Sequence, residues 1–210
     1  MERVRFGEKL TVAPVAIGTM NLLDWGVDAR GLLDRVKEYI DLGLTTFDLA
    51  DIYGGGGCEE LFGQMLALEP SIRDKIEIIS KGCIVYDKLR RPYFVSESYN
   101  LSKNYILSAC NASLRRLGVE SLDLYLLHRP CPLMDPAEVA EALQKAAAFG
   151  ARTASLTGDP DSPLARAGGT LLSLPCSLPG GLPPVTHFVL GYVLLALVAV
   201  DWGLRQKTIT

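Results

Sequence analysis

Segments with strand-like and helix-like patterns alternate regularly through the first 149 residues, and this alternation constrains the fold more than any other feature. Apolar residues repeat at helical spacing from Leu32 to Ile40, for example, and the short apolar run Thr45–Leu49 follows. Strands that alternate with helices in this way favour a parallel sheet joined by right-handed helical crossovers. We therefore expect an α/β fold.

Four strand–helix units are expected by residue 149, after a short hairpin over Arg3–Val12. The expected strands are Ala13–Gly18, Thr45–Leu49, Ile76–Ser80 and Leu122–Leu127. The expected helices are one through Leu32 and Ile40, followed by Glu59–Leu68, Lys103–Leu117 and Pro136–Phe149. Gly43 and Gly118 stand where the end of a helix favours left-handed backbone, and Asp135-Pro136 has the residue types of a helix start.

The composition changes near residue 145. Residues 1–145 hold 38 charged side chains, whereas residues 146–210 hold seven charged side chains, six of the twelve prolines and eight of the twenty glycines. The later part offers two more strands, Arg152–Leu156 and Thr170–Leu174, with a short helix over Ser162–Ala167 between them. A closed barrel of eight such units takes ~250 residues. We therefore expect an open or partly closed parallel sheet of about six strands, whose edges invite a homodimer.

Charge and cysteine content exclude several classes of function. The net charge of −3 provides no basic face for nucleic acid or an anionic membrane. The five cysteines are widely spaced and form no metal-ligand pattern, so we expect no metal site and reduced thiols in the cytoplasm. The apolar segment Val185–Val200 is shorter than the ~20 residues of a membrane span. It favours a buried helix, with a membrane anchor as the alternative.

Four polar residues stand at or just past the ends of successive expected strands: Asp48 with Tyr53, then Lys81, then His128. Sites of parallel α/β proteins are built at this edge of the sheet. A lysine ammonium beside a tyrosine stabilises its phenolate, a carboxylate keeps the lysine charged, and a histidine orients a carbonyl oxygen. Together these groups would polarise an aldehyde or ketone during hydride transfer. Taken singly, each has an ordinary structural interpretation, such as a turn, a cap or a satisfied histidine.

The first part of the chain, residues 1–142, resembles the N-terminal half of an aldo-keto reductase. The matching segments are AIGTM at 16–20, GLTTFDLADIYG at 43–54, CEELFG at 58–63, ISKG at 79–82, SLRRLG at 113–118, LDLYLLHRP at 122–130 and PLMDP at 132–136. The resemblance implies half of a (β/α)8 TIM barrel that reduces a small carbonyl substrate with NADPH. It implies Tyr53 as general acid, Lys81 and Asp48 as the partners that tune it, and His128 as the residue that orients the carbonyl.

The segments with which that family holds the NADP phosphates have no counterpart after residue 149. We therefore expect NADP(H) as cofactor by resemblance, no assigned cofactor-binding residue, and an activity that is weak or lost.

The second part, residues 143–210, resembles the second half of a SIS (sugar isomerase) domain, which binds phosphosugars. The segments that carry this resemblance are GARTASLTGDPDSPLARA at 150–167 and GTLLSLPC at 169–176. The resemblance implies two strand–helix units of a doubly wound fold and a chimera joined within the helix Pro136–Phe149. The alternative functions are thus a phosphosugar-binding module and a folded scaffold without activity.

Overall fold

The computed structural model describes residues 2–6, 10–86, 97–129, 131, 134–148, 154–157, 161, 166 and 170–173. The chain divides into two compact units, Met1–Cys131 and Pro132–Thr210, and each is described here by itself.

The first unit begins with the expected hairpin. Strands β1 (Val4–Phe6) and β2 (Leu10–Val12) pair antiparallel. Arg3 joins this hairpin to the sheet: its guanidinium donates to Thr45 Oγ1 at 2.8 Å and forms an ion pair with Glu77. The Glu77 carboxylate in turn accepts from the hydroxyls of Thr45 and Thr46, at 2.9 and 2.8 Å.

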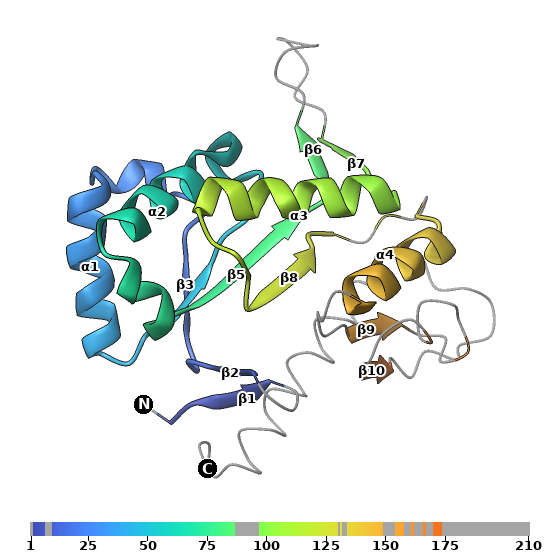
Figure 1. The fold of residues 1–210 in the computed structure, drawn as a ribbon, viewed down its shortest axis with the longest axis horizontal. Coiled ribbons are helices and arrows are strands. Elements are labelled where there is room, and N and C mark those ends of the chain that lie inside the picture. Colours follow the sequence, from blue (N-terminus) through green and yellow to red (C-terminus); the bar gives the residue numbers. More distant parts are fainter. Residues whose placement is uncertain are drawn as a thin grey trace. The chain divides into compact units, whose positions relative to one another are not determined.

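A four-stranded parallel sheet forms the centre of this unit (Figure 1). Its strands are β3 (Ala16–Gly18), β4 (Thr46–Asp48), β5 (Glu77–Gly82) and β8 (Leu124–Leu127), and they are paired in that order. The helices between them are α1 (Ala29–Asp41), α2 (Gly57–Leu68) and α3 (Lys103–Leu117), with α2 packed against both α1 and α3. The strand–helix units predicted for this part of the chain are confirmed.

Local sequence sets the ends of these helices. The Asp28 side chain accepts from the Gly31 amide at 2.9 Å and caps α1, and the Ser102 hydroxyl caps α3 through the Tyr105 amide at 3.3 Å. Helix α3 ends at Gly118, whose φ of 66° is the left-handed conformation that glycine adopts without strain. The predicted bounds of this helix, Lys103–Leu117, match the structure.

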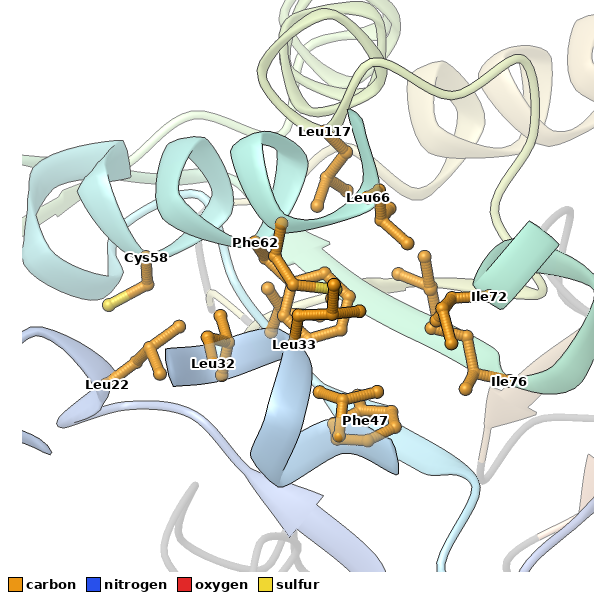
Figure 2. Packing of buried hydrophobic residues seen from close by; sticks show 14 residues of the cluster. Leu22, Leu32, Leu33, Phe47, Cys58, Phe62, Leu66, Ile72, Ile76 and Leu117 are labelled. Atoms are coloured by element: carbon orange, nitrogen blue, oxygen red, sulfur yellow. The ribbon is translucent and has the colours of Figure 1, made fainter. Parts of the chain in front are cut away.

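The hydrophobic core lies between these helices and one face of the sheet (Figure 2). Its buried members are Leu22, Leu32, Leu33, Val36, Phe47, Leu49, Cys58, Phe62, Met65, Leu66, Ile72, Ile76, Ile78 and Leu117. Phe47 contributes from β4 and Ile78 from β5, and the Phe47 ring lies 5.3 Å from that of Phe62 on α2. Since side chains alternate along a strand, Asp48 and Lys81 belong to the opposite face of the sheet.

Gly63 sets how closely α2 approaches α3. A Cβ at this position would lie 2.2 Å from the Arg116 carbonyl oxygen and 2.9 Å from the Leu117 Cα. We expect Gly63→Ala to lower the free energy of unfolding by about 2–3 kcal/mol, because backbone must move to admit the methyl group. Chemical denaturation measures this. Gly18→Ala is the control, since no atom lies within 4 Å of its Cβ position. Equal stability changes in the two variants would contradict the prediction.

One hairpin of the first unit lies outside the predicted elements. Strands β6 (Ile84–Tyr86) and β7 (Glu97–Tyr99) pair antiparallel directly after β5. No strand was predicted between Lys81 and Lys103, because the two segments are short and far apart.

The second unit contains α4 (Pro136–Ala148) and a parallel pair made of β9 (Ala154–Thr157) and β10 (Thr170–Ser173). The side chain of Asp135 accepts from the Ala137 amide at 2.9 Å, as expected of a helix start.

Within the described ranges, the strands of the first unit pair as a parallel sheet of four, and β9 and β10 of the second unit pair with each other. The expected single sheet of six strands stays a prediction. The predicted helix over 162–167 and the apolar segment 185–200 lie outside the described residues, apart from Arg166. Across the part of the chain that is described, no helix is long and apolar enough to cross a membrane.

Candidate active site

Lys81 joins two of the predicted site residues directly. Its Nζ lies 2.7 Å from Asp48 Oδ1 and donates to the Tyr53 hydroxyl at 3.2 Å. A third hydrogen bond, 2.9 Å long, goes to the Leu49 carbonyl oxygen. The ammonium also lies 4.9 Å from the centre of the Tyr53 ring. The lysine is therefore held between a carboxylate and a phenol in a partly buried position.

His128 completes the group from the neighbouring strand. Its backbone amide donates to the Gly82 carbonyl oxygen at 2.9 Å, which fixes the residue at the end of β8 beside the end of β5. Its ring meets the Tyr53 ring edge-on, with centroids 5.8 Å apart and an interplanar angle of 81°. Imidazole and phenol thus face one another at the same edge of the sheet.

The backbone around these residues explains why they meet. Asp48 ends β4, and its carbonyl oxygen accepts from both the amide and the hydroxyl of Thr19, at 3.1 and 2.9 Å. Tyr53 begins a 3-10 turn, Tyr53–Gly56, in which Gly54 and Gly55 have positive φ. Lys81 lies within β5, one residue beyond the strand end predicted at Ser80. The register pairs β5 with β4 and β8, so all four residues reach one edge.

This arrangement has a definite chemical capacity. A phenol that receives a hydrogen bond from an ammonium is prepared to give up its own proton to an acceptor on its other side. The carboxylate of Asp48 keeps the ammonium in place through a charge-assisted hydrogen bond. The structure brings Asp48, Tyr53, Lys81 and His128 together, while their catalytic roles stay predictions.

A buried charged network near the site was not predicted from the sequence. Glu59 on α2 is completely buried and accepts from Ser80 Oγ at 2.6 Å and from Arg116 Nε at 2.7 Å. Arg116 Nη2 lies 2.6 Å from the same carboxylate and donates to Ser113 Oγ at 3.2 Å. An acidic residue on the apolar face of the predicted helix Glu59–Leu68 was the available signal. Among the described residues, no group of three or more potential ligands could hold a metal ion.

A second polar cluster lies beside Gly82. Asp51 Oδ1 and the Tyr125 hydroxyl are both buried and accept or donate no hydrogen bond. Burial and the neighbouring Glu59 raise the pKa of Asp51 from 3.8 to about 6. Burial also raises the pKa of the adjacent Cys83 thiol to about 12, and Cys83 has an unusual φ of 81°. Two side chains with unmet hydrogen-bonding capacity therefore lie directly behind Lys81.

The raised pKa of Asp51 predicts a pH-dependent stability. The folded protein holds this proton more tightly than the unfolded chain, so the contribution is fully present below pH 3.8 and is lost as the pH rises through about 6. We expect Asp51→Asn to gain about 2 kcal/mol over the parent between pH 4 and pH 8, allowing for partial solvent exposure. Urea denaturation across this range measures the difference, with Asp34→Asn on the exposed face of α1 as control. A constant difference between variant and parent would contradict the prediction.

Comparisons with known proteins agree with this geometry. The model of the aldo/keto reductase family matches residues 14–153. Over 144 residues the chain is 45% identical to the uncharacterized oxidoreductase YcsN of Bacillus subtilis and 40% identical to oxidoreductase YdhF of Escherichia coli. These alignments cover 69% and 65% of this chain and 48% of each relative.

The solved structures give the same result. An aldo-keto reductase from Klebsiella pneumoniae in complex with NADPH matches with a TM-score of 0.56 and 30% identity, over 79% of this chain and 52% of that one. The chain thus spans about half the length of the curated relatives it matches. The family match extends past residue 142 to residue 153, and the SIS resemblance and the chimera stay predictions. The strand–helix order, the site geometry and the family match lead to one conclusion: the chain belongs to the aldo/keto reductase family.

Proposed function

We propose that this protein reduces a small aldehyde or ketone with NADPH, by the chemistry of the aldo-keto reductases. The observation that carries the proposal is the placement of Lys81 Nζ, 2.7 Å from the Asp48 carboxylate and 3.2 Å from the Tyr53 hydroxyl. The combination is suited to a tyrosine that acts as an acid.

In this proposal Tyr53 donates its proton to the carbonyl oxygen of the substrate. Lys81 stabilises the phenolate that remains, and Asp48 keeps the ammonium charged and oriented. His128, whose ring meets Tyr53 edge-on, orients the carbonyl oxygen toward the phenol. These four residues supply the proton and the alignment of the substrate.

The residues at this edge fit the carbonyl side of the reaction. When bound, NADPH would supply the hydride. For its phosphates the sequence assigns no binding residue, and the cation of the site, Lys81, already donates to three oxygen atoms. Because no residue is assigned to the cofactor phosphates, we expect the activity of this chain to be weak or lost.

The experiment is a direct assay. The protein is incubated with NADPH and a panel of small aldehydes and ketones, and NADPH consumption is followed by its absorbance. In parallel, NADPH is titrated while the fluorescence of Trp25 and Trp202 is recorded. A substrate-dependent rate supports the proposal. Binding of NADPH without a substrate-dependent rate would place the defect in catalysis. The absence of both binding and a rate would overturn the proposal for the isolated chain.

The parallel pair of β9 and β10 supports a second candidate function, a phosphosugar-binding module. These strands overlap the two expected in the SIS-like segment, Arg152–Leu156 and Thr170–Leu174. Stabilisation by hexose phosphates in a thermal-shift assay would favour it, and an unchanged melting temperature at millimolar ligand would dispose of it. Light scattering on the same sample tests the expected homodimer. If the protein is a monomer that responds neither to NADPH and carbonyl compounds nor to hexose phosphates, the remaining alternative is a folded scaffold without activity.

A further inference from the structure

Asp51 lies between two of the candidate site residues in the sequence. It follows Asp48 by three residues and precedes Tyr53 by two. Its backbone amide donates to the Lys81 carbonyl oxygen at 2.9 Å. This bond ties the backbone of Asp51 to that of Lys81.

The Asp51 side chain approaches Tyr125 across Gly82. The Tyr125 hydroxyl lies 2.1 Å, and Asp51 Oδ2 lies 3.0 Å, from the position that a Cβ of Gly82 would occupy. Both oxygens thus lie against the same Cα, and only a glycine leaves room for them. Asp51 Oδ1 and the Tyr125 hydroxyl are buried without a hydrogen-bond partner, which is an expensive state for either group. One hydrogen bond between them would satisfy both.

We propose that Asp51 is a positioning residue: the Tyr125 hydroxyl donates to its carboxylate, and this pair fixes the Lys81–Gly82 segment so that the Lys81 ammonium stays against Tyr53. The pair acts through the backbone bond between Asp51 and Lys81 and makes no contact with a substrate. The proposal deepens the proposed function and rests on it only for its consequence in catalysis.

The groups that face Asp51 agree with this assignment. Glu59 faces it from α2 and disfavours its negative charge, whereas Arg116 on α3 favours it. Tyr105 on α3 and Cys83 after β5 are also near its charge. Of these neighbours, Tyr125 is the hydroxyl that lies against Gly82 and lacks a partner, so it is the donor available to the carboxylate.

The experiment uses two NMR measurements that need neither NADPH nor a substrate. The first is the titration of the Asp51 carboxyl carbon, assigned with Asp51→Asn. Without a Tyr125 hydrogen bond, burial and Glu59 raise the pKa of Asp51 to about 6, so with the proposed bond we expect a parent midpoint below that value. In Tyr125→Phe we expect it to rise by on the order of one pH unit, because the carboxylate loses its donor. Tyr105→Phe is the matched control and should leave the midpoint in place. A midpoint that is unchanged or lower in Tyr125→Phe would overturn the pairing.

The second measurement is the cross-relaxation between the Lys81 ε-methylene and the Tyr53 ring. It should weaken at least twofold in Asp51→Ala and Tyr125→Phe and be retained in Asp51→Asn, whose side chain still bonds Tyr125. Equal loss in Asp51→Ala and Asp51→Asn, or no loss in either, would refute the positioning role. Circular dichroism confirms that each variant is folded. If the pair is found but carbonyl reduction is absent, the proposed function fails and this inference stands.

Discussion

Replacing Tyr53 by Phe should lower kcat/KM for the NADPH-dependent reduction of an aldehyde by on the order of 100-fold or more. The substitution keeps the ring that meets His128 and packs beside the Lys81 ammonium, and removes only the hydroxyl to which Lys81 donates. The carbonyl oxygen would then receive its proton from water instead of a positioned acid. Steady-state kinetics on the best substrate of the aldehyde panel measures the change.

Tyr39→Phe is the matched control for this loss. Tyr39 lies on α1 and packs against Phe47 on the helix side of the sheet, away from the candidate site. Removing its hydroxyl should leave kcat/KM within about twofold of the parent, since it contacts no site residue. An equal kcat/KM in the parent and in Tyr53→Phe would show that Tyr53 is not the general acid, whatever the control shows.

Replacing Arg116 by Ala should lower the free energy of unfolding by about 3–5 kcal/mol. Glu59 has no exposed surface, and the two Arg116 nitrogens at 2.7 and 2.6 Å are its cationic partner. Without the guanidinium, a carboxylate would remain in the interior with the Ser80 hydroxyl as its donor. Chemical denaturation at neutral pH gives the difference. The neighbouring Arg115 is exposed, and Arg115→Ala should change stability by less than about 0.5 kcal/mol.

A double replacement separates the buried charge from lost packing. Glu59→Leu combined with Arg116→Met removes both charges and keeps most of the volume, so it should recover most of the stability that Arg116→Ala loses. If the double variant is as unstable as the single one, packing of the arginine stem is the dominant contribution, and the charge argument is wrong.

The sequence was most informative where local patterns decide the structure. Helix α3 has a serine cap, an amphipathic repeat and a terminal glycine, and its bounds Lys103–Leu117 were predicted as they occur. The four predicted site residues also lie together as their places at strand ends indicated, because parallel pairing brings successive strand ends to one edge. Both inferences depend on regular geometry, which sequence periodicity reports.

Features that depend on contacts between distant residues were not predictable in this way. The parallel pairing of β9 with β10 in the second unit is one such feature, because the alternation of strands and helices does not specify which strands pair. Asp51 and Tyr125 are 74 residues apart in the sequence, and both place an oxygen close to the position that a Cβ of Gly82 would occupy. Nothing in the local pattern around Tyr125 distinguishes it from a tyrosine on an ordinary strand.

The order of the strands in the sheet also has a consequence for synthesis. Because β3, β4, β5 and β8 pair in the order in which they leave the ribosome, each strand can join one that is already present. Arg116, however, follows Glu59 by 57 residues. At ~5–20 residues per second this interval lasts roughly 3–11 seconds. During that time Glu59 on α2 lacks its cationic partner and Gly63 lacks α3 against it, so we expect the nascent chain to expose this helix to chaperones and proteases.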